Sequence, residues 1–154
     1  MLRAPAQPSP SGSVKRQAEA LQAAGVSVEI FVFRGRNVYN YAAAWIRLRP
    51  RLRPELYDLV HAQDTSNVLI ALPKRVPLVV TLEKWDVPPL RERLLARFLA
   101  CRADAVIVAS DDVGGRVHTG SPVHVIPHGL SESALTARLL AVYRSVVPNR
   151  FSAS

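Results

Sequence analysis

Short apolar runs alternate with helix-patterned segments along most of this chain, and that alternation constrains the fold more than any other feature. The runs are rich in β-branched residues, which favour strands. The segments between them place apolar residues three and four positions apart, which favours helices. We expect strands at residues 27–33, 59–62, 77–81, 105–109 and 123–126, and helices at residues 13–24, 37–49, 65–72, 90–102 and 131–146. The predicted fold class is α/β, a doubly wound parallel sheet with both faces covered, in a single domain.

Local signals predict where the helices begin and end and which faces they bury. Ser13 and Thr65 are the expected N-caps, and Gly25 is expected to end the first helix. Apolar rows predict three buried helix faces: Tyr41, Trp45 and Leu48; Leu90, Leu94 and Phe98, widened by Leu95 and Leu99; and Leu135, Leu139 and Val142.

The composition excludes several classes of protein. A chain of 154 residues with 49% hydrophobic residues is long enough to bury one core. Its single cysteine excludes an intrachain disulfide framework and a paired-cysteine metal site, and indicates a reducing compartment. The sequence shows neither an uncharged apolar stretch of about 18 residues nor a secretory leader. These observations predict a cytoplasmic protein.

The charge balance is basic, with 20 Lys and Arg against 12 Asp and Glu, a net +8. Phosphate, anionic lipid and nucleic acid are the partners that such a charge favours. The run RLRPRLRP places Arg47, Arg49, Arg51 and Arg53 close together, and each basic residue near an anionic membrane contributes about 1 kcal/mol. Peripheral contact with the inner face of a membrane is therefore one hypothesis. The other explanation of the arginine excess is a GC-rich genome.

Candidate site residues follow the predicted strands. Ligands of open parallel sheets lie beyond the carboxyl ends of the strands. The positions to consider there are His61, Asp64, Glu83, Ser110, His128 and Gly129. The spacing of these residues in the sequence matches neither a nucleophilic triad nor a metal site.

Five segments follow one another in the order of a known family: PSPSGSVKRQAEALQAAGVSVEIFVF, YDLVHAQ, PLVVTLEKWD, RADAVIVAS and VHVIPHG. With them, the chain resembles the N-terminal domain of family 4 glycosyltransferases, of the retaining GT-B type, over residues 8–129. The resemblance implies a Rossmann-like domain that holds the acceptor and faces a second domain across a cleft. That second domain holds the nucleotide-sugar, which is a co-substrate, and the family needs neither a metal nor a covalently bound cofactor.

The resemblance also implies roles for individual residues. Gly12 and Ser13 would lie in the loop that faces the donor diphosphate. Glu83 stands where many members carry a histidine in a Thr-x-His pattern, which makes it the candidate catalytic residue. An ionised carboxylate accepts hydrogen bonds or acts as a base, but it does not donate as an imidazole does. The alternative is a solvated glutamate paired with Lys84.

The remaining candidates each have a structural alternative. His61, Asp64 and Ser110 would face the sugar or acceptor, yet a histidine here is often packed, and Ser110 fits a helix cap. His128 and Gly129 resemble the turn at which the chain crosses between domains, and a turn that requires glycine explains them equally well.

The departures from the family define the expected domain organisation. We expect a Pro/Ser-rich loop at 1–12, a family 4-like N-terminal domain at 13–129 and a divergent helical tail at 130–154. The family's first strand and its C-terminal donor domain are not found, so the chain is interpreted as a fragment that is inactive alone, and an unpaired sheet edge predicts marginal stability. The alternative function is a basic module that binds anionic membrane or nucleic acid. Nucleic acid is disfavoured because the sequence lacks aromatic stacking platforms and a known binding motif.

Overall fold

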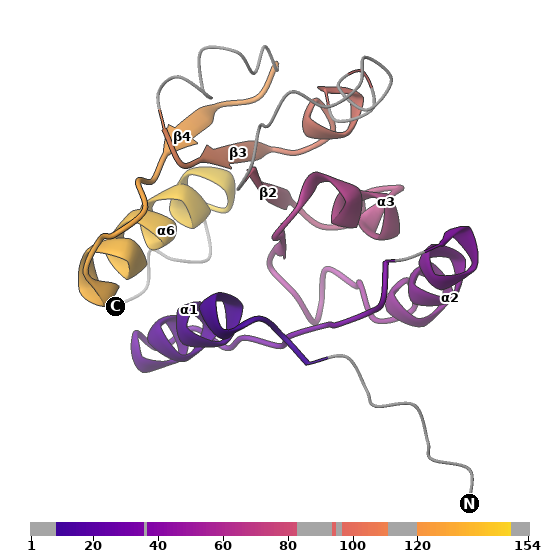
Figure 1. Ribbon diagram of the computed structural model, residues 1–154, viewed down its shortest axis with the longest axis horizontal. Helices are drawn as coiled ribbons and strands as arrows, with labels where there is room; N and C mark the ends of the chain where they lie inside the picture. The colour runs from indigo at the N-terminus through magenta and orange to yellow at the C-terminus, as the bar shows by residue number, and fades with distance from the viewer. Residues whose placement is uncertain (1–8, 36, 83–93, 95–96, 111–119, 149–154) are drawn as a thin grey trace, which may run out of the picture.

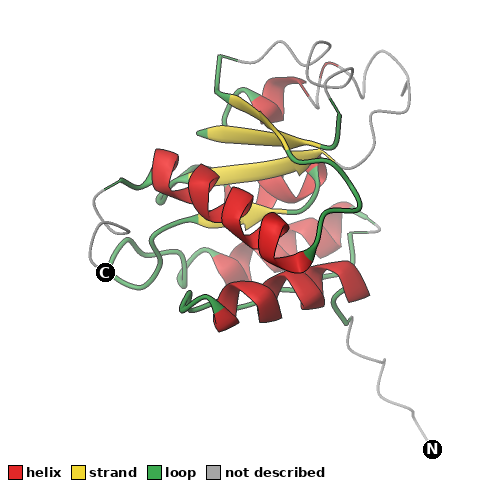
Figure 2. Ribbon diagram, turned by 90° about the vertical axis from the view of Figure 1, so that its left-hand side faces the viewer, coloured by secondary structure: helices red, strands yellow, loops and turns green. Residues whose placement is uncertain are grey.

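The computed structural model describes residues 9–35, 37–82, 94, 97–110 and 120–148. Its centre is one sheet of four parallel strands in the order β1-β2-β3-β4. The strands are β1 (Val60–Ala62), β2 (Leu78–Leu82), β3 (Ala105–Val108) and β4 (Val123–Val125). Helices cover both faces of this sheet (Figure 1, Figure 2). The predicted α/β, Rossmann-like class is confirmed.

The helices divide into two groups, one on each face of the sheet. They are α1 (Gly12–Ala23), α2 (Val38–Leu48), the short 3-10 helix η1 (Thr65–Asn67), α3 (Val68–Ala71) and α6 (Glu132–Val146), and residues 97–100 are also helical. One core cluster, here the α2–α3 cluster, joins α2, α3 and residues 99–103 to alternate residues of the strands, such as Val80. The other, the α1–α6 cluster, joins α1 and α6 to the intervening residues, such as Val79.

The two central strands are buried as fully covered parallel strands should be, whereas β1 and β4 at the sheet edges are mostly partly buried. All four residues of β3 and four of the five residues of β2 are buried. The register pairs Val80 with Val106, so the most buried parts of the two strands lie side by side. This confirms the interpretation of the continuous apolar runs.

The N-caps differ from the predicted ones by a residue or two. Ser11, not Ser13, caps α1, and its hydroxyl accepts a hydrogen bond from the Val14 N–H at 3.4 Å. Asp64, not Thr65, caps η1, and its carboxylate accepts from the Ser66 N–H at 2.9 Å. In both cases the capping residue has the extended backbone that precedes a helix, which the sequence does not reveal.

The predicted end of α1 is confirmed at Gly25. Its φ of +86° is the left-handed conformation that glycine adopts without strain. The Gly25 N–H donates to the Gln22 carbonyl at 3.0 Å, and the Val26 N–H donates to the Leu21 carbonyl at 3.0 Å. These bonds satisfy the last carbonyls of the helix.

Residues 27–33 form no strand, so the prediction of one there is wrong. The segment does alternate, because Val28 packs against the α1–α6 cluster and Phe33 packs against the α2–α3 cluster. However, no strand in the described part of the chain pairs with it, and β1 pairs only with β2. The apolar alternation therefore reports burial on two sides, whereas a strand also requires a neighbour for its backbone.

The predicted buried faces are partly correct. In α6, Leu139 and Val142 are buried and Leu135 is partly buried, as expected. The row of Leu94 and Phe98 is wrong, since these side chains are 60% and 52% exposed. Leu99, predicted on the same face, is buried as expected, together with Ala100 and with Ala103 just after the helix. Leu90 and Leu95 lie outside the described residues.

The predicted face of α2 is nearly right. Leu48 is buried and Tyr41 is partly buried. Trp45 lies at the edge, 36% exposed, where its indole N–H donates to the Leu72 carbonyl at 2.6 Å. That bond ties α2 to the end of α3.

Candidate functional site

Four of the predicted site residues follow the carboxyl ends of strands. β1 leads directly to Asp64, β3 leads to Ser110, and β4 leads to His128 and Gly129. Because all four strands are parallel, these ends share one edge of the sheet. Glu83 and Lys84 follow β2 in the sequence, but both lie outside the described residues.

Helix α1 reaches this edge through one side-chain contact. The Gln63 amide, just past β1, donates to the Gln17 side-chain carbonyl at 2.9 Å. Gln17 lies in the amino-terminal half of α1, so that half of the helix adjoins the carboxyl end of β1. A helix N-terminus presents free N–H groups and a partial positive charge to an anion.

Gly12 and Ser13 occupy the first turn of α1. The N–H groups of Val14 and Lys15 already bond to Ser11, at 3.4 and 3.0 Å, so Gly12 and Ser13 hold the next N–H groups that an anion would meet. A Cβ atom placed on Gly12 would have nothing within 4 Å. Gly12 therefore leaves open space in front of the helix, and packing does not require the glycine.

His61 lies within β1. The expectation that it follows the end of the strand is therefore wrong. Its Nδ1 is 2.8 Å from the Tyr143 hydroxyl, and its Nε2 is 2.7 Å from the Thr81 hydroxyl. Desolvation lowers the pKa of His61 to about 4, so the ring is neutral near pH 7. With both nitrogens bonded, the packed, hydrogen-bonded interpretation of His61 is the one that the geometry supports.

Two residues of this network were missed by sequence reasoning. Tyr143 is buried on α6, and burial raises the pKa of its phenol. Thr81 is the polar residue near the end of the apolar run of β2. The one available signal was a hydroxyl within each apolar pattern, because a buried hydroxyl normally has a partner.

The other candidates have clear local surroundings. Asp64 is exposed, and its carboxylate bonds both the N–H and the hydroxyl of Ser66, at 2.9 and 3.2 Å. Ser110 is exposed in a bend after β3, and the residues it was expected to cap lie outside the described part of the chain. His128 is exposed, and Gly129 has a φ of +83°, so the turn does require a glycine.

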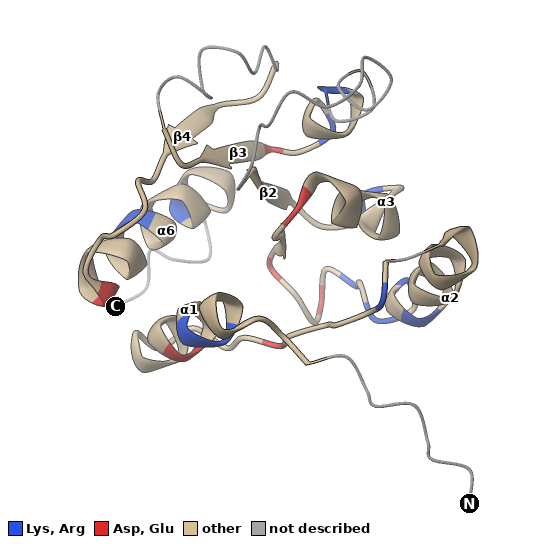
Figure 3. Cartoon of the chain, in the orientation of Figure 1, with Lys and Arg blue, Asp and Glu red and all other residues tan. Residues whose placement is uncertain are grey.

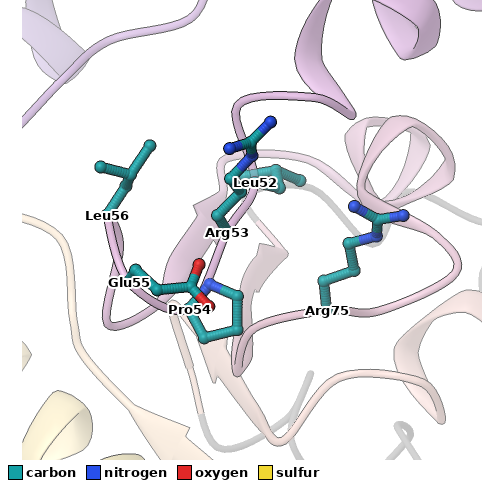
Figure 4. A pocket seen from close by; sticks show the side chains of 6 residues that line it. All are labelled: Leu52, Arg53, Pro54, Glu55, Leu56 and Arg75. Carbon is teal, nitrogen blue, oxygen red and sulfur yellow. The ribbon is translucent and has the colours of Figure 1, made fainter.

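A surface hollow of about 590 Å³ lies elsewhere, as Figure 4 shows. Its lining residues are Leu52, Arg53, Pro54, Glu55, Leu56 and Arg75. Residues 52–56 precede β1 and Arg75 precedes β2, which places the hollow toward the amino ends of the strands. It is therefore separate from the edge where the candidate residues gather.

The four arginines of the RLRPRLRP run do not form one unoccupied patch. Each guanidinium group contacts a different part of the fold. The contacts are Arg47 with the Phe31 ring at 5.9 Å, Arg49 with the Trp45 ring at 4.9 Å, Arg51 with the Glu29 carboxylate at 3.3 Å, and Arg53 with the Pro50 carbonyl at 3.0 Å. Only the contact of Arg51 is with an opposite charge.

The described residues contain no group of three or more His, Cys, Asp or Glu side chains that would hold a metal ion. They also contain no helix long and apolar enough to cross a membrane.

Comparison with known proteins decides the family. The model for Glycosyltransferase Family 4 matches residues 11–133, which include the whole sheet and α1. The chain belongs to glycosyltransferase family 4. The chain is also similar in structure to a solved structure of sucrose-phosphate synthase from Thermosynechococcus elongatus, with a TM-score of 0.64 and 15% sequence identity. The match covers 86% of this chain and 93% of the sucrose-phosphate synthase chain. At that identity the likeness shows the Rossmann-like fold alone, and no curated protein matches this family 4 chain.

Proposed function

We propose that this chain is the acceptor-side domain of a retaining, nucleotide-sugar-dependent glycosyltransferase of the GT-B type. One observation carries the proposal: within the segment that matches family 4, Asp64, Ser110, His128 and Gly129 each follow the carboxyl end of a strand of the parallel sheet. That edge is where open α/β sheets bind their ligands.

The proposed division of labour follows the geometry of the edge. The N–H groups of Gly12 and Ser13 would face the diphosphate of the donor, assisted by the α1 dipole. Ser110 and His128, both exposed, would contact the sugar or acceptor hydroxyls. Glu83, next along the chain from β2, would accept a hydrogen bond or act as a base.

His61 has a supporting role in this proposal. Its neutral ring joins β1 to β2 and α6, and so fixes the strand that leads to Asp64. Because its two nitrogens bond hydroxyl groups inside the core and desolvation lowers its pKa to about 4, His61 is assigned a positioning role here.

Transfer with retention would pass through an oxocarbenium-like transition state. The leaving phosphate of the donor would stabilise this positive charge. A second domain would hold the nucleotide-sugar, no metal or covalent cofactor would take part, and the reaction would take place in the cytoplasm. The family match and the parallel strands, whose carboxyl ends lie at one edge of the sheet, support this proposal.

Reconstitution with a donor domain tests the proposal. The chain is mixed with a separately produced family 4 donor domain. The donors are a panel of nucleoside diphosphate sugars that carry a label in the sugar, and the acceptors are alkyl glycosides. We expect donor turnover that requires both proteins and falls at least tenfold in Glu83→Gln. Glu55→Gln, at the amino-end hollow, is the matched control and should keep full turnover. A folded complex without turnover of any donor would contradict the proposal.

A further inference from the structure

The outer face of α2 carries apolar side chains into solvent. Tyr39 is 84% exposed and Ile46 is 65% exposed, and Ala42 and Ala43 between them are exposed as well. Positions three, four and seven apart lie along one face of a helix, so these residues form a single stripe, here called the α2 stripe. The opposite face, which includes Ala44, is buried in the α2–α3 cluster. A helix that is apolar on its solvent side as well as its core side marks an interaction surface.

Arginines flank the α2 stripe on both sides. At about 100° per residue, Arg47 and Arg49 fall on opposite borders of the stripe. Their guanidinium groups lie over the rings of Phe31 and Trp45, at 5.9 and 4.9 Å. A contact with a ring leaves the positive charge in place, so both borders of the stripe stay cationic.

The segment around α2 is basic, although Glu29 and Glu55 stand directly before and after it and Glu29 pairs with Arg51. Residues 30–54 contain six arginines and neither Asp nor Glu. In Figure 3, blue positions gather on α2 and on the chain at its two ends. Figure 1 shows α2 at one end of the molecule, away from the sheet edge formed by β4.

We propose that α2 is a docking helix for an anionic membrane surface. Tyr39, Ala42, Ala43 and Ile46 enter the boundary between headgroups and acyl chains, and Arg47 and Arg49 contact lipid phosphates. This is the arrangement of an interfacial amphipathic helix, in which long basic side chains extend toward the headgroups. The 11 residues of α2 span about 16 Å, so the helix lies on a bilayer and does not cross it.

Charge selects the membrane over the other occupants of the α2 stripe. A second copy of the chain would bring the same basic face against itself, since a symmetric dimer pairs identical surfaces. Nucleic acid would match the arginines but would leave the apolar stripe without a partner. An anionic bilayer satisfies both components. The proposal does not depend on sugar transfer.

Vesicle co-sedimentation of the full chain tests the proposal. The vesicles are phosphatidylcholine alone or a mixture with phosphatidylglycerol, at low and at high salt. We expect binding to the anionic vesicles only, reduced by salt. Ile46→Ser should lower the partition coefficient about tenfold or more, because it removes an inserted side chain. Arg47→Gln and Arg49→Gln should each lower it about fivefold.

Matched controls separate docking from general surface effects. Leu56→Ser removes an apolar side chain of the same exposure, 66% against 65% for Ile46, outside α2. Arg144→Gln removes an exposed positive charge from α6, which packs on the other face of the sheet. Both should bind as the parent chain does.

Four outcomes would overturn the proposal. The first is equal binding to neutral and anionic vesicles, and the second is an equal loss of vesicle binding in Ile46→Ser and Leu56→Ser. The third is binding to duplex DNA without binding to vesicles. The fourth is self-association that Ile46→Ser abolishes, in a chain that does not bind vesicles.

Discussion

His61 Nδ1 lies 2.8 Å from the hydroxyl of Tyr143, a residue 82 positions further along the chain. The contact joins β1 to α6, and Tyr143 lies beyond residues 11–133 that match the family model. Helix α6 is thus part of the same core, because Leu139 and Val142 pack in the α1–α6 cluster.

The Tyr143 hydroxyl is expected to contribute to stability through His61. Tyr143→Phe leaves Nδ1 without its partner in a desolvated site, which costs about 1–3 kcal/mol of unfolding free energy. Urea denaturation followed by circular dichroism measures the change. Tyr39→Phe, at a residue 84% exposed, is the matched control and should be neutral. Equal stability of the two variants would show that the buried hydrogen bond contributes nothing.

The neutral His61 makes stability depend on pH. Its pKa is about 4 in the fold, against 6.5 for an ordinary histidine, so the unfolded chain binds more protons between these values. Stability should therefore be full above about pH 6.5 and fall as the pH drops toward 4, by about 3 kcal/mol from this residue.

The non-titrating variant His61→Gln isolates this contribution. Its unfolding free energy, measured by urea denaturation across the same pH range, should fall less steeply than that of the parent chain. Parallel curves would exclude a depressed pKa at His61.

Asp104 is expected to contribute more to the free energy of unfolding than its ion pair with Lys74 does. One carboxylate oxygen accepts from the Leu78 N–H at 2.8 Å, and the other lies 2.7 Å from Lys74 Nζ. Asp104→Ala removes a backbone partner at the start of β2 and should cost about 1–3 kcal/mol. Lys74→Ala breaks only a partly exposed ion pair and should cost under about 1 kcal/mol. Thermal unfolding compares the two, and a larger loss in Lys74→Ala would contradict the assignment.

Two glycines should respond to alanine in opposite ways. Gly129 has a φ of +83°, so Gly129→Ala should lose about 1–2 kcal/mol of unfolding free energy. Gly12 begins α1 with open space around it, so Gly12→Ala should be neutral or gain up to about 1 kcal/mol. Chemical denaturation measures both, and a loss in Gly12→Ala would mean that its surroundings are tighter than the structure shows.

Residues 105–108 and 78–82 show what the sequence can predict. Their apolar runs are long enough that burial on both faces is the single consistent interpretation, and the structure agrees. Residues 27–33 have a similar pattern but no strand, because pattern reports where side chains go and cannot supply a hydrogen-bonding neighbour. Leu94 and Phe98 fail for a related reason: spacing defines a helix face, but only tertiary packing decides which face is covered.

The candidate site divides in the same way. Strand ends can be read from the sequence, so the positions of Asp64, Ser110 and His128 at one edge were predictable. The partner of His61 was not, because a contact across 82 residues depends on how α6 packs. The hydrogen bond from Gln63 to Gln17 likewise needed the position of α1.

Ligand binding to the full chain tests whether the carboxyl edge of the sheet is the substrate site. The full chain is titrated with UDP and with inorganic pyrophosphate while the backbone amide shifts are followed by NMR. We expect saturable shifts at Gly12, Ser13, His128 and Gly129, with weak affinity because one domain acts alone. Shifts confined to Arg53 and Arg75, at the amino-end hollow, or no saturable shifts in a folded chain, would contradict it.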